Sequence, residues 1–199
     1  MTMRVLLIAA ALLAGCGDDW SEPRAKPAAV GTLGPGFVNP ADPPAPEATI
    51  TPRPGSWDGV HPPEGYRVVL LTVGEDRTTE AVRAWAERED VRLKTVTAAN
   101  PTEYIERIVE AMELQGDLIV AVGDGLVDPL AVVTANHLDR QFLLVGSELP
   151  EPTENVTAVR WGSDPERAIR AGVAAVLHGW TGIALRLDEP RSVALAPRS

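Results

Sequence analysis

The sequence contains one cysteine and three histidines in 199 residues, and both shortages restrict the chemistry available to it. A single cysteine cannot form a disulfide within the chain, and it offers no set of thiolates to hold a metal ion. His61, His137 and His178 stand far apart, in no spacing typical of a Ser-His-Asp triad or a metal site. The sequence therefore favours a protein that is not an enzyme and that has no metal site or cofactor.

Positive charge and long apolar runs are scarce as well. The formal net charge is −10 at pH 7, which argues against nucleic acid as a partner, because its phosphates are bound by clustered Lys and Arg. The apolar run at 5–14 has ten residues, and a helix needs about 20 to cross the bilayer core. We therefore expect this run to belong to a signal peptide rather than to a membrane-spanning helix.

The first 16 residues have the layout of a secretory signal with a processing site. Arg4 precedes the apolar run, and the sequence Leu13-Ala14-Gly15-Cys16 resembles the lipobox of bacterial lipoproteins. This resemblance implies that residues 1–15 are removed and that Cys16 becomes an N-terminus carrying diacylglycerol and a further acyl chain such as palmitate. Two or more chains anchor a protein stably, whereas one binds only marginally. We therefore expect an extracytoplasmic lipoprotein, anchored to the bacterial cell membrane by Cys16.

Proline is concentrated between the lipidated cysteine and residue 63. Eleven of the 18 prolines fall there, in stretches such as NPADPPAPEATITPRPG that have few apolar residues and no helical or strand periodicity. Such a composition buries too little apolar surface to offset the entropy lost on ordering. The sequence thus predicts a disordered, semi-extended linker at 16–63, with Trp57, Val60 and Tyr66 docking its last residues onto a domain at 64–188. Residues 189–199 are predicted to be a C-terminal tail.

From residue 66 onward, apolar runs alternate with amphipathic segments of ten to fifteen residues. Strands are predicted at 67–73, 91–98, 117–123, 141–146, 155–162 and 181–187. The pairs Asn100-Pro101 and Asp164-Pro165 are typical of an N-cap followed by the first helical residue. Strands that alternate with helices imply right-handed crossovers and a mostly parallel sheet covered on both faces. The predicted fold is therefore an α/β domain of three layers.

The candidate site lies in the loops that follow the strands, because parallel α/β sheets bind ligands at the carboxyl ends of their strands. Glycine lets the backbone approach a ligand closely, and carboxylates accept hydrogen bonds from hydroxyl groups. These loops are acidic and lack lysine, so a small hydroxylated ligand such as a nucleoside or sugar is favoured over a phosphate. The alternative interpretation is that they contain ordinary turn glycines and helix-capping acids. The candidate ligand-binding residues are Glu75, Asp76, Asn100, Gly123, Asp124, Gly125 and Ser147.

Two long segments, at 116–146 and 154–184, resemble the basic membrane protein family, which comprises substrate-binding lipoproteins of ABC transporters that capture purine nucleosides. Gly123 and Gly125 match the glycines of the family's Gly-x-Gly-Phe turn, with Leu126 in place of the aromatic residue. Asn155-Val156 and the Gly-Val-Ala-Ala sequence at 172–175 match as well. The resemblance implies one lobe, the N-terminal domain, of a type-I periplasmic-binding-protein fold. It also implies an ABC transporter permease, or another envelope protein, as partner.

Two departures from the family bear on the ligand. Residues 74–78 lack the Phe and Asn with which the family's first loop contacts the nucleoside. The resemblance also covers only the first of the two domains that close around the ligand. A ligand bound on one open face has less of its surface buried than a ligand in a typical small-molecule pocket. The alternative hypothesis is a ligand-free interaction module of the envelope, meeting its partner through an apolar patch around an edge strand at 181–187 or through a dimer.

Overall fold

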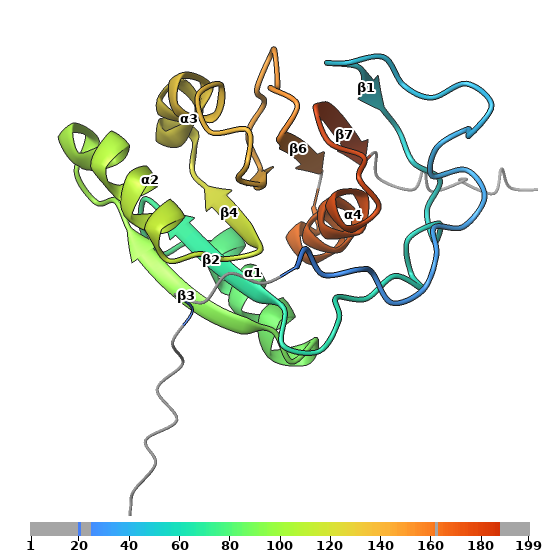
Figure 1. The fold of residues 1–199 in the computed structure, drawn as a ribbon, viewed down its shortest axis with the longest axis horizontal. Helices are drawn as coiled ribbons and strands as arrows, with labels where there is room; N and C mark the ends of the chain where they lie inside the picture. Colours follow the sequence, from blue (N-terminus) through green and yellow to red (C-terminus); the bar gives the residue numbers. More distant parts are fainter. Residues whose placement is uncertain (1–19, 21–24, 162, 188–199) are drawn as a thin grey trace, which may run out of the picture.

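The computed structural model describes residue 20 and residues 25–161 and 163–187. The predicted signal peptide, the lipidated Cys16 and the predicted C-terminal tail lie outside the described residues. The described residues form seven strands and four α-helices (Figure 1). The strands are β1 (Thr49–Ile50), β2 (Arg67–Thr72), β3 (Arg92–Thr97), β4 (Leu118–Val122), β5 (Phe142–Val145), β6 (Val156–Trp161) and β7 (Ile183–Leu187). The α-helices are α1 (Arg77–Arg88), α2 (Tyr104–Glu113), α3 (Val127–Thr134) and α4 (Pro165–Leu177), and 3-10 turns at Pro101–Glu103 and Asp124–Leu126 precede α2 and α3.

The seven strands form a single sheet in the order β1-β7-β6-β5-β4-β2-β3, and every pairing in it is parallel. This confirms the predicted α/β fold with its central parallel sheet. The central strands are apolar throughout because both of their faces are covered. In β2, for example, Val68 and Leu70 face one core cluster, and Val69 and Leu71 face the other.

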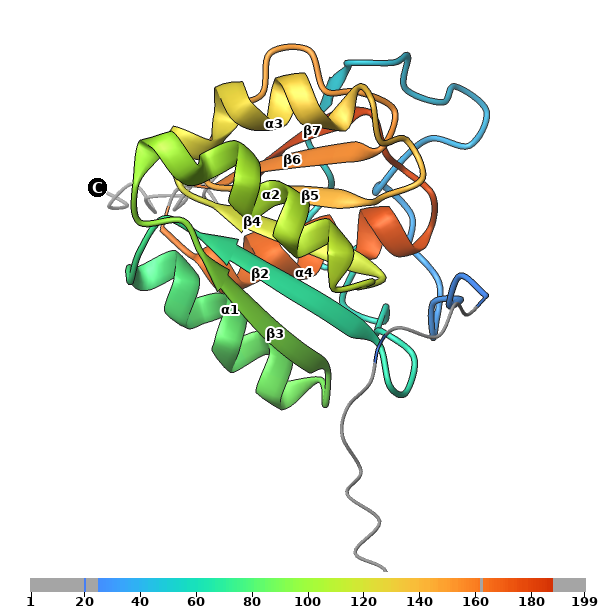
Figure 2. The ribbon, with the colours of Figure 1, turned by 60° about the vertical axis from the view of Figure 1, so that its left-hand side comes forward.

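The helices form one layer on each side of the sheet. The first layer contains α1 and α4, which pack against each other, and the second contains α2 and α3. Figure 2 shows α2 and α3 on the near side of the sheet and α4 behind it. We call the two sides of the sheet the α1–α4 face and the α2–α3 face. Among the described residues, no helix is long and apolar enough to cross a membrane.

The predicted capping is confirmed at Asn100, which caps the 3-10 turn before α2, and at Asp164, which caps α4. Asp164 caps α4 by accepting a hydrogen bond from the Arg167 amide at 3.1 Å, and proline follows it as expected. In α2 the apolar residues Ile105 and Val109 would widen the apolar stripe around Ile108, but their side chains are 47% and 39% exposed. The buried side of α2 lies around Ile108, so the helix is rotated away from its widest apolar stripe.

The crossover from β6 through α4 to β7 has the opposite hand to the others. Along the strand order, the chain moves from β4 to β5 through the α2–α3 face, and from β6 to β7 in the same direction through the α1–α4 face. Since nearly all such crossovers are right-handed, the prediction of uniformly right-handed units is wrong here. Placing α4 beside α1 leaves the other face of β6 and β7 without that helix, which is where a groove is found.

The N-terminal segment is ordered over the part that the structure describes, so the prediction of a disordered linker at 16–63 is wrong for residues 25–63. β1 pairs with β7, and Val30 forms an antiparallel bridge with His61. Phe37 is buried against Trp57, at 6.2 Å between ring centroids in an edge-on arrangement. The predicted docking of Trp57, Val60 and Tyr66 is confirmed, because all three are buried in the core on the α1–α4 face.

The position of β1 also corrects the expectation of an edge strand at 181–187. β7 lies between β6 and β1, so both of its backbone edges have a partner strand. Ile183, Leu185 and Leu187 are all buried. This strand therefore does not present the exposed apolar patch that the interaction-module hypothesis places there.

Candidate functional site

Threonine side chains fix the conformation of the loop after β2 through hydrogen bonds to its backbone. The Gly74 carbonyl accepts hydrogen bonds from the hydroxyls of Thr72 at 2.6 Å and Thr79 at 3.1 Å. Asp76, a predicted ligand-binding residue, caps α1 by accepting a hydrogen bond from the Thr79 amide at 2.7 Å. The carboxylate of Asp76 thus stabilises the start of a helix.

Glu75 and Asn100 also have local partners. Glu75 forms an ion pair with Arg83 of α1, and the side-chain hydrogen bond from Arg83 lowers the pKa of the Glu75 carboxyl from its ordinary value. The Asn100 side chain accepts hydrogen bonds from the amide and the hydroxyl of Thr102, at 3.1 and 3.0 Å. Asp76 and Asn100 therefore cap the helical turns that follow them, as the alternative interpretation of the strand-end residues predicts.

In the turn after β4, neighbouring side chains leave no room for a Cβ at Gly123 or Gly125. Gly123 has a φ of 122°, and a Cβ there would lie 2.5 Å from a methyl group of Val73. A Cβ on Gly125 would lie 2.7 Å from the hydroxyl oxygen of Tyr104. The close approach that these glycines permit is therefore to neighbouring side chains.

Asp124 and Ser147 are the predicted site residues that the structure brings together. They follow the adjacent strands β4 and β5, and the Ser147 hydroxyl donates a hydrogen bond to the Asp124 carboxylate at 2.5 Å. Asp124 is exposed, whereas Ser147 is buried. Ser147 also lines a groove on the α2–α3 face of the sheet, so it links the predicted strand-end site to that groove.

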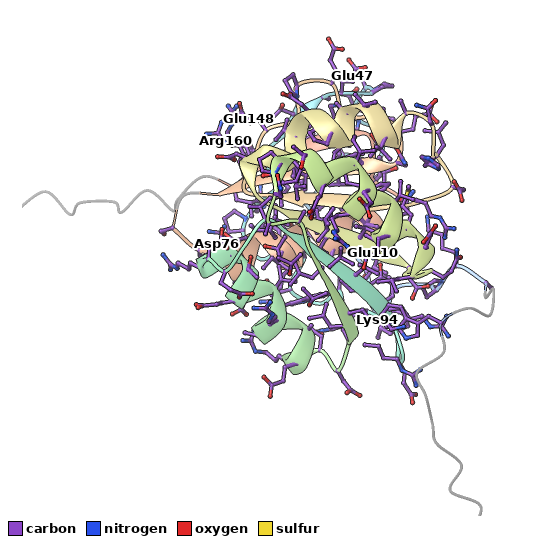
Figure 3. All side chains as sticks on the ribbon, turned by 90° about the vertical axis from the view of Figure 1, so that its left-hand side faces the viewer. Glu47, Asp76, Lys94, Glu110, Glu148 and Arg160 are labelled. Atoms are coloured by element: carbon purple, nitrogen blue, oxygen red, sulfur yellow. The ribbon has the colours of Figure 1, made fainter. Side chains whose placement is uncertain are left out.

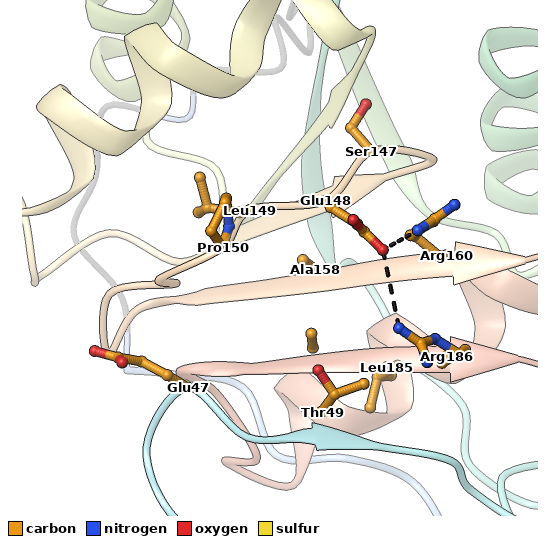
Figure 4. Close-up of a pocket in the computed structure, with 11 residues that line it drawn as sticks. Glu47, Thr49, Ser147, Glu148, Leu149, Pro150, Ala158, Arg160, Leu185 and Arg186 are labelled. Carbon is orange, nitrogen blue, oxygen red and sulfur yellow. Dashed lines mark hydrogen bonds and ion pairs between the residues drawn. The ribbon is translucent and has the colours of Figure 1, made fainter.

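The groove has a volume of about 210 Å³ and lies over β6, β7 and β1 (Figure 4). The small side chains of Ala158 and Ala184, which are register partners on β6 and β7, form its floor. Thr49 of β1 and the loop at 147–150 form its sides. Among the described residues that line the groove, none belongs to a helix, and α4 packs on the other side of the sheet.

Charged side chains stand at both ends of the groove. Arg160 and Arg186 lie near the carboxyl ends of β6 and β7, and both pair with Glu148 of the loop after β5. Figure 3 shows Glu148 and Arg160 side by side, with Asp76 at the same end of the molecule. Glu47 lies at the opposite end of the groove (Figure 4).

Of these charged residues, Glu148 belongs to a loop that was predicted to contribute to the site, whereas Glu47, Arg160 and Arg186 were not predicted from the sequence. The signal available for the arginines was a repeated pattern, since Ala158-Val159-Arg160 and Ala184-Leu185-Arg186 each place a small residue two positions before an arginine. That spacing puts both residues on the same face of a strand, but only the register between β6 and β7 brings the two patterns together. Within the described part of the chain, no three His, Cys, Asp or Glu side chains are grouped in a way that could hold a metal ion.

Comparisons with known proteins give similar folds at low identity. No family model matches the chain, and no curated protein matches it. A solute-binding protein of an ABC transporter system from Aeropyrum pernix K1 aligns with 50% of this chain and 29% of its own, at 20% identity and a TM-score of 0.43. A solute-binding protein of such a system from Conexibacter woesei DSM 14684 aligns with 49% of this chain and 35% of its own, at 20% identity and a TM-score of 0.42.

A fragment from Peptoclostridium difficile 630, described as a lipoprotein, aligns with 57% of this chain and 98% of its own, at 19% identity and a TM-score of 0.49. The matched region is therefore about a third of the length of the two solute-binding proteins and nearly all of the lipoprotein fragment. With all three TM-scores below 0.5, we take neither ligand nor partner from these neighbours. Membership of the basic membrane protein family stays a prediction.

Proposed function

We propose that this chain is a ligand-binding module of the bacterial cell envelope, anchored to the membrane through lipidated Cys16. Its ligand is a small molecule bound in the groove over β6, β7 and β1, next to the strand ends. Binding without catalysis is proposed, in a solute-binding role that would deliver the ligand to an ABC transporter permease.

The observation that carries this proposal is the groove itself. Ala158 and Ala184 leave open space above two strands whose other face is fully packed. Ligands of parallel α/β proteins bind near the carboxyl ends of the strands, and this groove reaches that end at Ser147 and Arg160. The volume of about 210 Å³ suits a ligand smaller than those of most drug-sized pockets, which have about 300–1,000 Å³.

Hydroxyl groups on the ligand would meet acceptors at the predicted strand-end site. The Asp124 carboxylate is exposed and holds the Ser147 hydroxyl. A ribose or sugar hydroxyl donating to Asp124 would compete for that carboxylate. This is the support for a nucleoside or another small hydroxylated ligand.

Thermal unfolding of the soluble chain from Gly17 to Ser199, screened against nucleosides, sugars and amino acids, tests this function. A ligand at 100 times its Kd stabilises the folded state by about 2.7 kcal/mol, which raises the Tm by roughly 5–10 °C for a chain of this size. The variant Ala184→Leu fills the groove floor and should abolish the shift. Ala131→Leu, on the exposed surface of α3, should preserve it.

A cooperatively unfolding protein whose Tm moves with no compound would contradict the proposed function. A shift that Ala184→Leu leaves intact would place the ligand outside the groove.

A second candidate function is an interaction module, and one observation favours it. Ile105 and Val109 are exposed one turn apart on α2, and Val132 is 64% exposed on the neighbouring α3. Exposed apolar side chains one turn apart on a helix can form part of an interaction site. Cysteine-directed crosslinking from Val109→Cys in intact cells would detect a partner on this surface, and finding monomer alone would exclude it.

A further inference from the structure

Arg160 and Arg186 form a pair of like charges that the sheet itself enforces. They are register partners on the parallel strands β6 and β7, whose backbones lie about 4.8 Å apart. Like charges opposite each other on a sheet are unfavourable. An anion placed between the two guanidinium groups relieves that repulsion.

A carboxylate of the chain takes that place. The same Glu148 oxygen pairs with Arg160, and with Arg186 at 4.0 Å (Figure 4). Among the described residues, one carboxylate therefore faces two guanidinium groups, so that two positive charges meet one negative charge. The side chains of Glu148, Arg160 and Arg186 are 56%, 51% and 57% exposed.

Because all three side chains are more than half exposed, the pairs that Glu148 makes are weak. Glu148 also belongs to the loop after β5 rather than to a strand or helix, so its side chain can turn outward without breaking an element. A ligand carboxylate that arrived in the groove would thus meet two arginines held in place by the sheet and a weakly held competitor.

We propose that the groove binds a small organic acid whose carboxylate takes the position of the Glu148 carboxylate between Arg160 and Arg186. The body of the ligand lies over Ala158 and Ala184. This inference rests on the proposed function and adds the acidic class of the ligand to it.

A carboxylate fits this place better than a phosphate does. The planar guanidinium group matches a carboxylate with two parallel hydrogen bonds, and a carboxylate already occupies the position in this structure. Glu47 and Glu148 both line the groove, and they repel the doubly charged form of a phosphate more strongly than they repel a single carboxylate.

Isothermal titration of the soluble Gly17–Ser199 chain with glucuronate and glucose tests the inference, because the two probes differ by one carboxylate. Succinate and inorganic phosphate complete the set. We expect glucuronate to bind at least about tenfold more tightly than glucose, as befits a hydrogen-bonded charge pair. Arg160→Gln and Arg186→Gln should each weaken glucuronate binding by about tenfold or more.

Glu148→Gln separates this proposal from a general attraction of anions to arginine. Removing the internal competitor should strengthen glucuronate binding severalfold, whereas Asp58→Asn, which removes another exposed partner of an arginine, should leave it unchanged. The Tm of each variant without ligand checks that it is folded. All four substitutions are at exposed side chains, so each variant should keep the wild-type Tm within a few degrees.

Four outcomes would overturn the inference. If glucuronate and succinate give no heat of binding while glucose or a nucleoside stabilises the protein, the ligand is not an acid, and the proposed function is unaffected. If no probe binds, charged or uncharged, both this inference and the proposed function are excluded. Phosphate binding more tightly than glucuronate through the same arginines would replace the carboxylate class, and an unchanged affinity in Glu148→Gln would exclude displacement of Glu148.

Discussion

Gly172 lies where α4 packs closely against the sheet. A Cβ there would lie 2.5 Å from one methyl carbon of Leu143 and 3.0 Å from the other. Leu143 is fully buried, so its side chain cannot turn away into open space. The glycine thus sets the distance between α4 and β5.

Gly172→Ala should therefore destabilise the protein in spite of alanine's better helix propensity. Overpacking costs about 1–3 kcal/mol and the propensity returns about 1 kcal/mol, so we expect a net loss of roughly 1 kcal/mol and a Tm lower by roughly 2–4 °C. Gly59→Ala is the matched control, since a Cβ at Gly59 meets nothing within 4 Å. A Gly172→Ala protein as stable as wild type would contradict this account of the helix–sheet contact.

Asn155 connects the start of β6 to the turn after α3. Its buried side-chain amide faces the carbonyls of His137 at 2.8 Å and Arg140 at 2.9 Å, and its oxygen accepts a hydrogen bond from Thr153. Every part of this amide is used inside the protein. The resemblance that singled out Asn155-Val156 thus marked a residue with a structural role in this chain.

Asn155→Asp should lower the free energy of unfolding by about 3 kcal/mol at pH 7, because the carboxylate oxygen that replaces the amide nitrogen would face carbonyl oxygens in a buried place. Urea denaturation of the soluble chain measures the loss. Asn136 is exposed and its side-chain amide donates to only one carbonyl, so the loss in the comparison variant Asn136→Asp should be far smaller. Equal effects in the two variants would show that burial of the Asn155 amide has no special weight.

The helix caps near the candidate site could be predicted from the sequence, whereas contacts between residues far apart in the chain could not. The caps at Asn100 and Asp164 depend on side chains and amides two or three residues apart, which the sequence displays directly. The Glu148–Arg160 pair depends on the packing of a loop beside a strand. No pattern along the chain encodes that proximity.

At the scale of elements, the N-terminal segment departs most from expectation. Its proline content predicts disorder because a chain poor in apolar residues cannot bury much surface. Few residues are enough here, since Phe37 and Trp57 each bury a large ring. In β1, backbone pairing with β7 also stabilises the segment. Amino-acid composition does not predict such pairing.

A chain that begins at Gly55 should be clearly less stable than one that begins at Gly17. It loses β1 and the ring of Phe37, and removing a buried Phe side chain alone costs about 3–5 kcal/mol. It also uncovers the edge of β7, which promotes association between sheets. Urea denaturation and gel filtration of the two chains test this, with Phe37→Ala in the longer chain as an intermediate case. Identical unfolding midpoints would show that residues 17–54 contribute nothing to the fold.

The elements from β2 to β7 were predictable because their apolar runs and caps are local, and the hand of their last crossover was not. All six strands predicted between residues 67 and 187 are present in the structure. The sequence of α4 is compatible with either face of the sheet, because a helix needs only one apolar stripe in both cases. Its packing against α1 selects the α1–α4 face, and the groove is a consequence of that selection.

At the scale of the whole molecule, the charge distribution has a local exception. The chain carries a net charge of −10, yet in the part of the chain that the structure describes, two arginines at one end of the groove pair with the same carboxylate. An acidic ligand is repelled by the protein as a whole and attracted at this one place. Salt screens the long-range repulsion within about 10 Å at 0.1 M, so binding of an acid should tolerate moderate salt better than it would in a basic protein.

The groove over β6, β7 and β1 is the proposed ligand-binding site, and amide chemical shifts of the soluble Gly17–Ser199 chain would locate a ligand there. Titration with glucuronate should move the amide signals of residues 147–148, 158–160 and 184–186 in a saturable way, while signals of α1 and α2 stay in place. Saturable shifts confined to other surfaces, or none in these three segments at millimolar ligand, would contradict the proposed site.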